Sequence, residues 1–364
     1  SSHLGTIVSR SGHLGTREPR SEALRAPSYL AMSGSGPEGD FKVCVIGGAG
    51  GIGQPLSLLM ATCPMVKELV VVDLNIAAVP APGVAADLSH LEGKCKVTSL
   101  VLTLNEDKLI DKGADALKGC HLVLVPAGLP RKPGQDRKDL LNVNASIAKQ
   151  NVEAVAKHCP NAVVGLIVNP VNSVVPAMCE LWVKKGLNPC KIVGISTLDV
   201  VRANKFVREI TGKPADVPVI GGHAGKTILP LFSQDAAGKT IAAGEVPALD
   251  ARVQDAGTEV VKEKNGKGSA TLSMAYAGAR LGKAVLSGLA GVETTECAYV
   301  KSAVQSGCAY FASKVTFGKD GVKEVHPVGE LSSHEQARLE ELVPILIEEI
   351  AAGLEYAAEN SLAE

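Results

Sequence analysis

The sequence predicts an α/β protein in which a doubly wound parallel sheet is followed by a second domain of mixed α+β structure. Apolar segments of strand length recur through the first half of the chain, segments with helical periodicity separate them, and aromatic residues make up only 3% of the composition. Near-continuous apolar strands are typical of parallel sheets that helices cover on both faces. With few aromatic residues, the core has to be built from Val, Leu, Ile and Ala.

The composition excludes several other classes of protein. The chain has 364 residues, 46% hydrophobic and 21% charged, as expected for one large or two medium globular domains. No apolar run reaches the roughly 20 residues that cross a bilayer. The 37 basic and 38 acidic side chains leave no net field to attract nucleic acid or anionic membrane. We therefore expect a small-molecule partner, with no nucleic acid and no membrane.

The nine cysteines are an odd set with no C-x-x-C or similar ligand spacing. This distribution favours reduced thiols over disulfides, and no metal site is expected. Residues 1–40 contain four Arg and many Ser, Gly and Pro, with two acidic residues before Ser33. Such a leader is typical of a transit peptide, and a disordered tail is the alternative. We expect an organelle matrix, with the mitochondrion favoured over a peroxisome, glyoxysome or plastid.

The expected elements of the first half follow one another in βαβ order. The apolar strands are 41–48, 67–74, 121–128 and 161–170. A helix over 52–63 follows the first strand, and a long helix over 136–159 separates the last two. This arrangement predicts a dinucleotide-binding domain over residues 41–185.

A second, catalytic or substrate domain is expected over residues 186–364. Its expected elements are a segment at 191–196, a helix around 199–212 closed by Gly212, a strand at 217–222, Ala-rich helices, a hairpin-like segment at 318–327 and a helix from 333 to 360.

The strongest local signal is the run GGAGGIG at 47–53, between the first strand and the first helix. Glycines there let backbone N–H groups approach a pyrophosphate at the positive end of the helix. Asp73 ends the next strand, where a carboxylate binds the ribose 2′-hydroxyl of NAD and repels the 2′-phosphate of NADP. We expect NAD as the cofactor. Glycines of a tight turn and an Asp that caps a strand are the structural alternatives.

A Pro- and Gly-rich loop at 126–140 carries four basic residues, among them Arg131 and Arg137. Guanidinium groups pair bidentately with carboxylates, and such a loop can close over an anionic substrate. On charge alone a solvated basic loop is the better interpretation. Because ligands of open α/β sheets bind at the carboxyl ends of the strands, we favour a substrate loop.

Two further segments carry groups suited to proton transfer and anion binding. Asp199 and Arg202 lie three residues apart in a predicted helix and share one face, as an ordinary salt bridge would also require. His223 follows a strand in the segment GGHAG (221–225). There the glycines are expected to leave room for a ligand beside a ring that carries protons near neutral pH.

Five motifs carry a resemblance to a known family. They occur in the order VIGGAGGIGQPLS, PAGLPRKPGQDR, VNPVNS, STLDVVRAN and GGHAG, and the likeness extends from about Phe41 to Asn360. The chain thereby resembles the lactate/malate dehydrogenase family, in particular the NAD-dependent malate dehydrogenases of mitochondria, glyoxysomes and related bacteria. The resemblance implies a Rossmann-type fold, reversible hydride transfer between (S)-malate and NAD giving oxaloacetate and NADH, and a homodimer.

The resemblance also implies roles for the matching residues. His223 is the expected general acid/base, and Asp199 orients its ring. The expected substrate ligands are Arg131 for the distal carboxylate, Arg137 for the carbonyl, Arg202 for the carboxylate beside the reacting carbon, and Asn169. The expected cofactor contacts are Gly47, Gly50, Ile52, Gly53, Asp73, Asn144 and Met274. Guanidiniums and a protonated imidazole complement the two carboxylates and the reacting carbonyl of oxaloacetate.

One departure and three rival interpretations accompany this expectation. Gln135-Asp136 stands where the family usually has Met-Thr, which places a carboxylate beside Arg137. A lactate-type dehydrogenase would carry Gln at position 131, and a catalytically silent scaffold would bind NADH without turnover. A short-chain dehydrogenase is suggested only by Tyr310 and Lys314, which we expect to pack in a helix.

The subunit interface implied by the resemblance would involve helices of the 199–212 type. The apolar residues of this helix could serve the interface or equally face the core. They are Val200, Val201, Phe206 and Val207.

Overall fold

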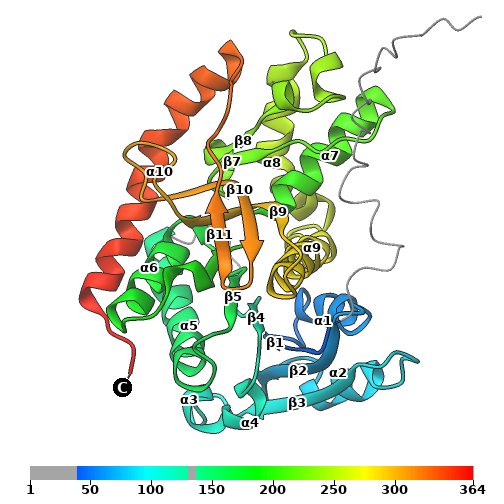
Figure 1. Cartoon of the computed structure of the whole chain (residues 1–364), viewed down its shortest axis with the longest axis vertical. Helices are drawn as coiled ribbons and strands as arrows, with labels where there is room; N and C mark the ends of the chain where they lie inside the picture. Colours follow the sequence, from blue (N-terminus) through cyan, green and yellow to red (C-terminus); the bar gives the residue numbers. More distant parts are fainter. Residues whose placement is uncertain (1–38, 130–136, 364) are drawn as a thin grey trace, which may run out of the picture.

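One continuous sheet of eleven strands forms the centre of the protein (Figure 1). The computed structural model describes the backbone of residues 39–129 and 137–363, and the side chains of residues 39–129 and 140–363. All of the expected leader except its last two residues lies outside the described residues. The strand order is β3-β2-β1-β4-β5-β6-β9-β10-β7-β8, and β11 pairs with β10.

The first six strands of this order are parallel; four of them are the strands predicted for the doubly wound half, and the sixth lies in the segment 191–196 expected in the second domain. The six strands are β3 (Lys96–Leu102), β2 (Val66–Leu74), β1 (Phe41–Ile46), β4 (Leu122–Val125), β5 (Val163–Leu166) and β6 (Ile192–Gly194). The chain reverses its direction of winding between β1 and β4, and ligands of such sheets bind at the carboxyl ends of the strands there. β3 is not among the strands expected from the sequence, because this edge strand is only half-buried and lacks a continuous apolar run.

The remaining strands continue the sheet in antiparallel fashion. They are β9 (Thr294–Lys301), β10 (Tyr310–Gly318), β11 (Gly321–Val325), β7 (Val219–Gly221) and β8 (Ile228–Pro230). β9 joins β6 of the parallel half through the pair Gly194 and Tyr299. The expectation that Tyr310 and Lys314 pack in a helix is wrong, because both lie in β10, where aromatic and β-branched neighbours favour a strand.

Helices cover both faces of the sheet. One face is covered by α3 (Leu109–Lys112), α4 (Ala114–Leu117), α5 (Arg137–His158), α6 (Val171–Lys184) and α10 (Ser333–Glu359). The other face is covered by α1 (Gly53–Ala61), α2 (Ala81–Leu88) and α9 (Leu272–Leu289). Short 3-10 helices are η2 (Pro189–Lys191), η3 (Gly225–Thr227), η4 (Phe232–Gln234) and η5 (Gly238–Thr240).

Helices α7 (Thr197–Thr211) and α8 (Val246–Glu263) pack beside β7 and β8 around a third apolar cluster. Gly212 ends α7 as predicted, with a φ of 68° that favours glycine. Three of the four apolar α7 residues considered for an interface, Val200, Phe206 and Val207, belong to this cluster, and Val201 packs against the core around α1 and α9. These residues therefore face the core of their own chain.

The described residues hold free thiols and no long apolar helix. All nine cysteines are free, and seven of them are buried. Over residues 39–129 and 137–363, no helix is both long enough and apolar enough to cross a bilayer. The same part of the chain holds no group of three or more His, Cys, Asp or Glu side chains arranged to bind a metal ion.

The C-terminal helix α10 lies alongside α6 (Figure 1). Its start is fixed by a capping box, in which the Ser332 hydroxyl accepts from the backbone N–H of Glu335 and the Glu335 carboxylate accepts from that of Ser332. Gly353 lies where the two helices meet, and a Cβ atom there would overlap the carbonyl oxygen of Ser173. The absence of a side chain at position 353 therefore permits the close contact between α6 and α10.

We predict that Gly353→Ala lowers the free energy of unfolding by about 2 kcal/mol, because the added methyl group forces the two helices apart. Helix propensity alone predicts the opposite sign, a gain of about 1 kcal/mol. Urea unfolding measures the change, and Ala351→Gly on the exposed face of α10 calibrates the propensity effect of this helix. A stabilised Gly353→Ala variant would contradict the close contact.

Candidate active site

His223 and Asp199 form the centre of the candidate site. Nδ1 of His223 lies 2.6 Å from Oδ2 of Asp199, whose side chain is fully buried. A carboxylate can only accept a hydrogen bond, so Nδ1 carries the hydrogen and Nε2 of the neutral ring is an acceptor. Asp199 comes from the first turn of α7, and His223 from the segment after β7. The structure therefore brings the predicted pair together and leaves Nε2 as the free acceptor of the neutral ring.

Arg202 lies one turn after Asp199 on α7. Its Nη1 is 3.8 Å from Oδ1 of Asp199, which is too far for a hydrogen bond. Burial lowers the pKa of the Arg202 guanidinium from its ordinary value, although the charges of Asp199 and Glu259 oppose that shift. No hydrogen bond from this guanidinium to another described side chain or backbone group is present, so its donors can serve an anionic ligand.

The glycines around His223 have a different role from the one expected. A Cβ atom on Gly222 would lie 2.5 Å from Nδ2 of Asn172 and 2.6 Å from Oγ1 of Thr227. A Cβ atom on Gly221, whose φ is 95°, would overlap the Thr227 carbonyl oxygen. The expectation that the glycines leave room for a ligand is therefore wrong for these two, which instead let the chain pack against neighbouring side chains. Of the three glycines, only Gly225 has open space at the place of a Cβ atom.

Asn172 is a site residue that the sequence alone does not single out. It lies in the first turn of α6, is 1% exposed, and its Oδ1 accepts a hydrogen bond of 2.7 Å from the backbone N–H of His223. The available signal is its place in the motif VNPVNS, in which the resemblance assigns a role only to Asn169. Asn169 is exposed at the carboxyl end of β5, where it can reach a ligand.

Asn144 on α5 ties two loops of this edge together. Its fully buried side chain accepts a hydrogen bond of 2.8 Å from the N–H of Leu129 and donates to the carbonyl oxygens of Leu129 (3.0 Å) and Asn169 (2.6 Å). The side chain thus joins the beginning of the arginine loop to the end of β5. Its expected contact with the cofactor stays a prediction.

The turn between β1 and α1 fits a dinucleotide pyrophosphate. Gly47 has a φ of 89°, and a Cβ atom there would lie 2.8 Å from the backbone of Ala127. A Cβ atom on Gly53 would overlap the carbonyl oxygen of Gly47, whereas Gly50 is exposed and nothing would lie closer than 3.4 Å to a Cβ atom there. No side chain caps α1, so its first N–H groups can bind an anion.

Asp73 and the start of α9 border the same turn. Oδ2 of Asp73 accepts a hydrogen bond of 2.8 Å from the N–H of Ala49, which places the carboxylate beside the glycines at the end of β2. Thr271, which precedes α9, lies 3.2 Å from the place of a Cβ atom on Gly51. Met274 is buried in the first turn of α9, and Ile52 packs against the same apolar core. The expected cofactor contacts therefore gather at one edge of the sheet.

The side chains of two expected substrate ligands lie outside the part of the chain that the structure describes. Arg131 lies outside the described residues, as does Gln135-Asp136. Arg137 is the first residue of α5, and its side chain is outside the described set. Their roles stay predictions from the sequence.

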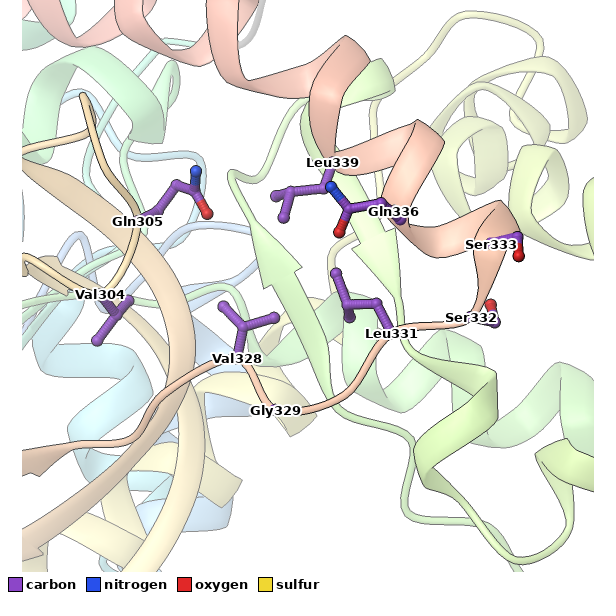
Figure 2. A pocket seen from close by; sticks show the side chains of 9 residues that line it. All are labelled: Val304, Gln305, Val328, Gly329, Leu331, Ser332, Ser333, Gln336 and Leu339. Atoms are coloured by element: carbon purple, nitrogen blue, oxygen red, sulfur yellow. The ribbon is translucent and has the colours of Figure 1, made fainter.

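A separate surface pocket lies at the beginning of α10 (Figure 2). Its walls are formed by residues 304–305, after β9, and by side chains between 328 and 339. None of the expected site residues lines it. The candidate active site is therefore defined by the convergence of side chains at the carboxyl edge of the sheet.

Comparisons with known proteins agree with this arrangement. Residues 41–194 match the NAD-binding domain of lactate/malate dehydrogenases, and residues 196–357 match their alpha/beta C-terminal domain. The mitochondrial malate dehydrogenase of Eucalyptus gunnii is 47% identical over 347 residues, which cover 94% of this chain and 97% of that protein. The mitochondrial malate dehydrogenase of Homo sapiens is 45% identical over 342 residues, which cover 92% of this chain and 98% of that protein.

A solved structure has the same fold. The crystal structure of Cryptosporidium parvum malate dehydrogenase matches with a TM-score of 0.73 at 26% identity, covering 86% of this chain and 99% of that chain. Together with the matches over both domains, this likeness shows that the chain belongs to the lactate/malate dehydrogenase family.

Proposed function

We propose that this chain is an NAD-dependent malate dehydrogenase of the mitochondrial matrix that interconverts (S)-malate and oxaloacetate. The observation that carries the proposal is the buried Asp199 carboxylate bound to His223, with Arg202 beside it. The similarity of the chain to relatives named mitochondrial malate dehydrogenase supports the substrate. Together with the Arg-rich, acid-poor leader it also supports the compartment.

Separate groups of residues would bind the cofactor and transfer the proton of the substrate. The glycine-rich turn, Asp73 and the start of α9 would hold NAD, which when bound supplies the acceptor for the hydride leaving C2 of malate. Nε2 of His223 takes the proton of the C2 hydroxyl, and the Asp199 carboxylate stabilises the imidazolium that forms. In the reverse direction the same imidazolium returns the proton to the carbonyl oxygen of oxaloacetate.

The arginines supply charge complementarity for a four-carbon diacid. Arg202 pairs with the carboxylate beside the reacting carbon, and Arg131 pairs with the distal carboxylate. Arg137 polarises the carbonyl, which gains negative charge as hydride is added, and Asn169 binds the substrate from the end of β5. Pyruvate lacks the second carboxylate and would leave the Arg131 guanidinium unpaired, which argues against a lactate-type enzyme.

Substrate preference tests this assignment. We predict that the enzyme prefers oxaloacetate to pyruvate in initial rates with NADH, and that Arg131→Gln lowers kcat/KM for oxaloacetate by about 10²-fold or more, because one charge-assisted pair is lost. Lys132→Gln removes a charge from the same loop and should retain the preference. Preference of the unaltered enzyme for pyruvate would overturn the substrate, and NADH binding without turnover would favour a silent scaffold.

A second test concerns proton transfer. His223→Asn should lower kcat/KM by roughly 10³-fold, since the general acid/base is removed. Asp199→Asn should also impair turnover strongly, because an amide does not stabilise the imidazolium. NADH affinity, followed by fluorescence titration, should stay unchanged. His326→Asn, whose ring bonds to Thr316 at the C-terminal hairpin, is the control. Normal turnover by His223→Asn would contradict the assignment.

We also propose that the enzyme is a homodimer, with the surface between α1 and α2 as part of the interface. Leu58, Val79 and Leu91 are 42%, 40% and 39% exposed and surround a shallow groove between these helices. Clustered exposed apolar side chains are typical of protein interfaces. The α7 residues considered from the sequence are already used in the core of the chain.

A charged substitution in the proposed interface tests it. Leu58→Asp should convert a dimer into a monomer in sedimentation equilibrium, because a carboxylate in an apolar interface is costly to desolvate. Leu354→Asp, at a residue 36% exposed on α10, should leave the dimer intact. A monomeric unaltered enzyme, or a Leu58→Asp dimer of unchanged affinity, would contradict this surface.

A further inference from the structure

We propose that Asn172 is a positioning residue for His223, and that Glu349 on α10 holds the Asn172 amide in the orientation this requires. The inference rests on the proposed role of His223 as general acid/base. It adds a second set of contacts, from α6 and α10, to the contact that Asp199 makes with the ring.

The partners of the Asn172 amide specify one orientation. Oδ1 accepts from the backbone N–H of His223 at 2.7 Å, and Nδ2 donates to Oε2 of Glu349 at 2.6 Å and to Oγ1 of Thr227 at 3.0 Å. With the amide reversed, a donor would face a backbone N–H and an acceptor would face a carboxylate. The carboxylate of Glu349 thereby selects the rotamer in which Oδ1 points at His223.

Thr227 closes the segment around this amide. Its hydroxyl donates to the carbonyl oxygen of Ala224 at 2.8 Å and accepts from the N–H of Ala224 at 3.2 Å. The N–H of Gly222 donates to the carbonyl oxygen of Thr227 at 2.8 Å. The residues on both sides of His223 are therefore bound to Thr227, and Asn172 binds both Thr227 and His223.

The backbone of Asn172 is held as well. The hydroxyl of Tyr299, on β9, donates to its carbonyl oxygen at 3.1 Å. Burial raises the pKa of Tyr299 well above its ordinary value, and electrostatic interactions with Glu349 and Cys308 raise it further. The hydroxyl therefore keeps its proton at neutral pH. The groups around Asn172 thus come from β9, α10, η3 and the segment after β7.

The packing of α10 against α6 brings Glu349 within reach. Gly353 follows Glu349 by one helical turn, and a Cβ atom there would overlap the carbonyl oxygen of Ser173 on α6. Glu349 is 177 residues away from Asn172 in the chain, yet their side chains share a hydrogen bond. The C-terminal helix is in this way connected through one amide to the backbone of the proposed catalytic residue.

Control of the His223 backbone matters because Asp199 contacts only the ring. A single hydrogen bond at Nδ1 leaves the ring free to follow any shift of its Cα atom. A displacement of about 1 Å in a reacting group can cost a factor of about 10² in rate. Asn172 limits that displacement, since it fixes the backbone N–H of the same residue.

The test exchanges the donor and acceptor roles of the pair. Asn172→Asp keeps the acceptor for His223 but places a second carboxylate against Glu349, and two carboxylates at this distance do not both ionise readily. We expect kcat to fall about tenfold or more at pH 8 with a smaller change in KM for oxaloacetate. The ratio of variant to unaltered kcat should recover at pH 6, where the pair shares a proton.

The double variant Asn172→Asp/Glu349→Gln supplies the missing donor. It should restore kcat to within about threefold of the unaltered enzyme and remove the added pH dependence, because the new amide donates to the new carboxylate. Glu349→Gln alone should have a small effect, since its Oε1 can accept from Asn172. A purely structural role would change thermal stability without this pattern of loss and rescue.

Glu349→Ala keeps the proposal testable if Asn172→Asp does not fold. It should lower kcat several-fold without changing NADH affinity, whereas Glu348→Ala, at the exposed neighbouring position, should not. Unchanged kcat and an unchanged pH profile in Asn172→Asp would overturn the role of Asn172. If Asn172→Asp does not fold, unchanged kcat in Glu349→Ala would do the same. In either case an inactive His223→Asn variant leaves the proposed function standing. An active His223→Asn variant would instead overturn the proposed function itself.

Discussion

The antiparallel contact between β6 and β9 is the constraint on which the rest of the structure depends. It joins the parallel half, which carries the glycine-rich turn, to the antiparallel strands that lead to His223. Gly194 makes this contact possible, because a Cβ atom there would lie 2.8 Å from a methyl group of Val175 and 3.1 Å from the carbonyl oxygen of Tyr299. One sheet therefore sets the distance between the cofactor edge and the proton-transfer pair.

Short connections from this sheet leave the site residues little freedom. Asp199 lies five residues after the end of β6, His223 two residues after β7, and Asn172 in the helix that follows β5. Two of the polar pairs join side chains from different elements, Asp199 with His223 and Asn172 with Glu349. Contacts from several elements hold these side chains in place, as pre-organised electrostatic catalysis requires.

Buried polar atoms usually have a hydrogen-bond partner, and one atom of the site is an exception. Among the described residues, Oδ1 of the fully buried Asp199 has no hydrogen-bond partner. A buried carboxylate oxygen without a donor is costly, and such exceptions occur where function requires them. The negative charge of Asp199 lies near the Arg202 guanidinium and the His223 ring, and it favours the imidazolium that proton transfer creates.

The sequence by itself determined the strands β1, β2, β4 and β5 of the parallel half, the glycine turn with Asp73, and the choice of Asp199, Arg202 and His223 as candidate residues, because these depend on periodicity and short motifs within one segment. Only the tertiary structure decided how the sheet continues through β9 and β10, and that Asn172 and Glu349 meet beside His223. It also decided that Gly221 and Gly222 serve close packing. The physical reason is that these features are contacts between distant segments, and local spacing carries no information about which side chains a folded sheet and its helices bring together.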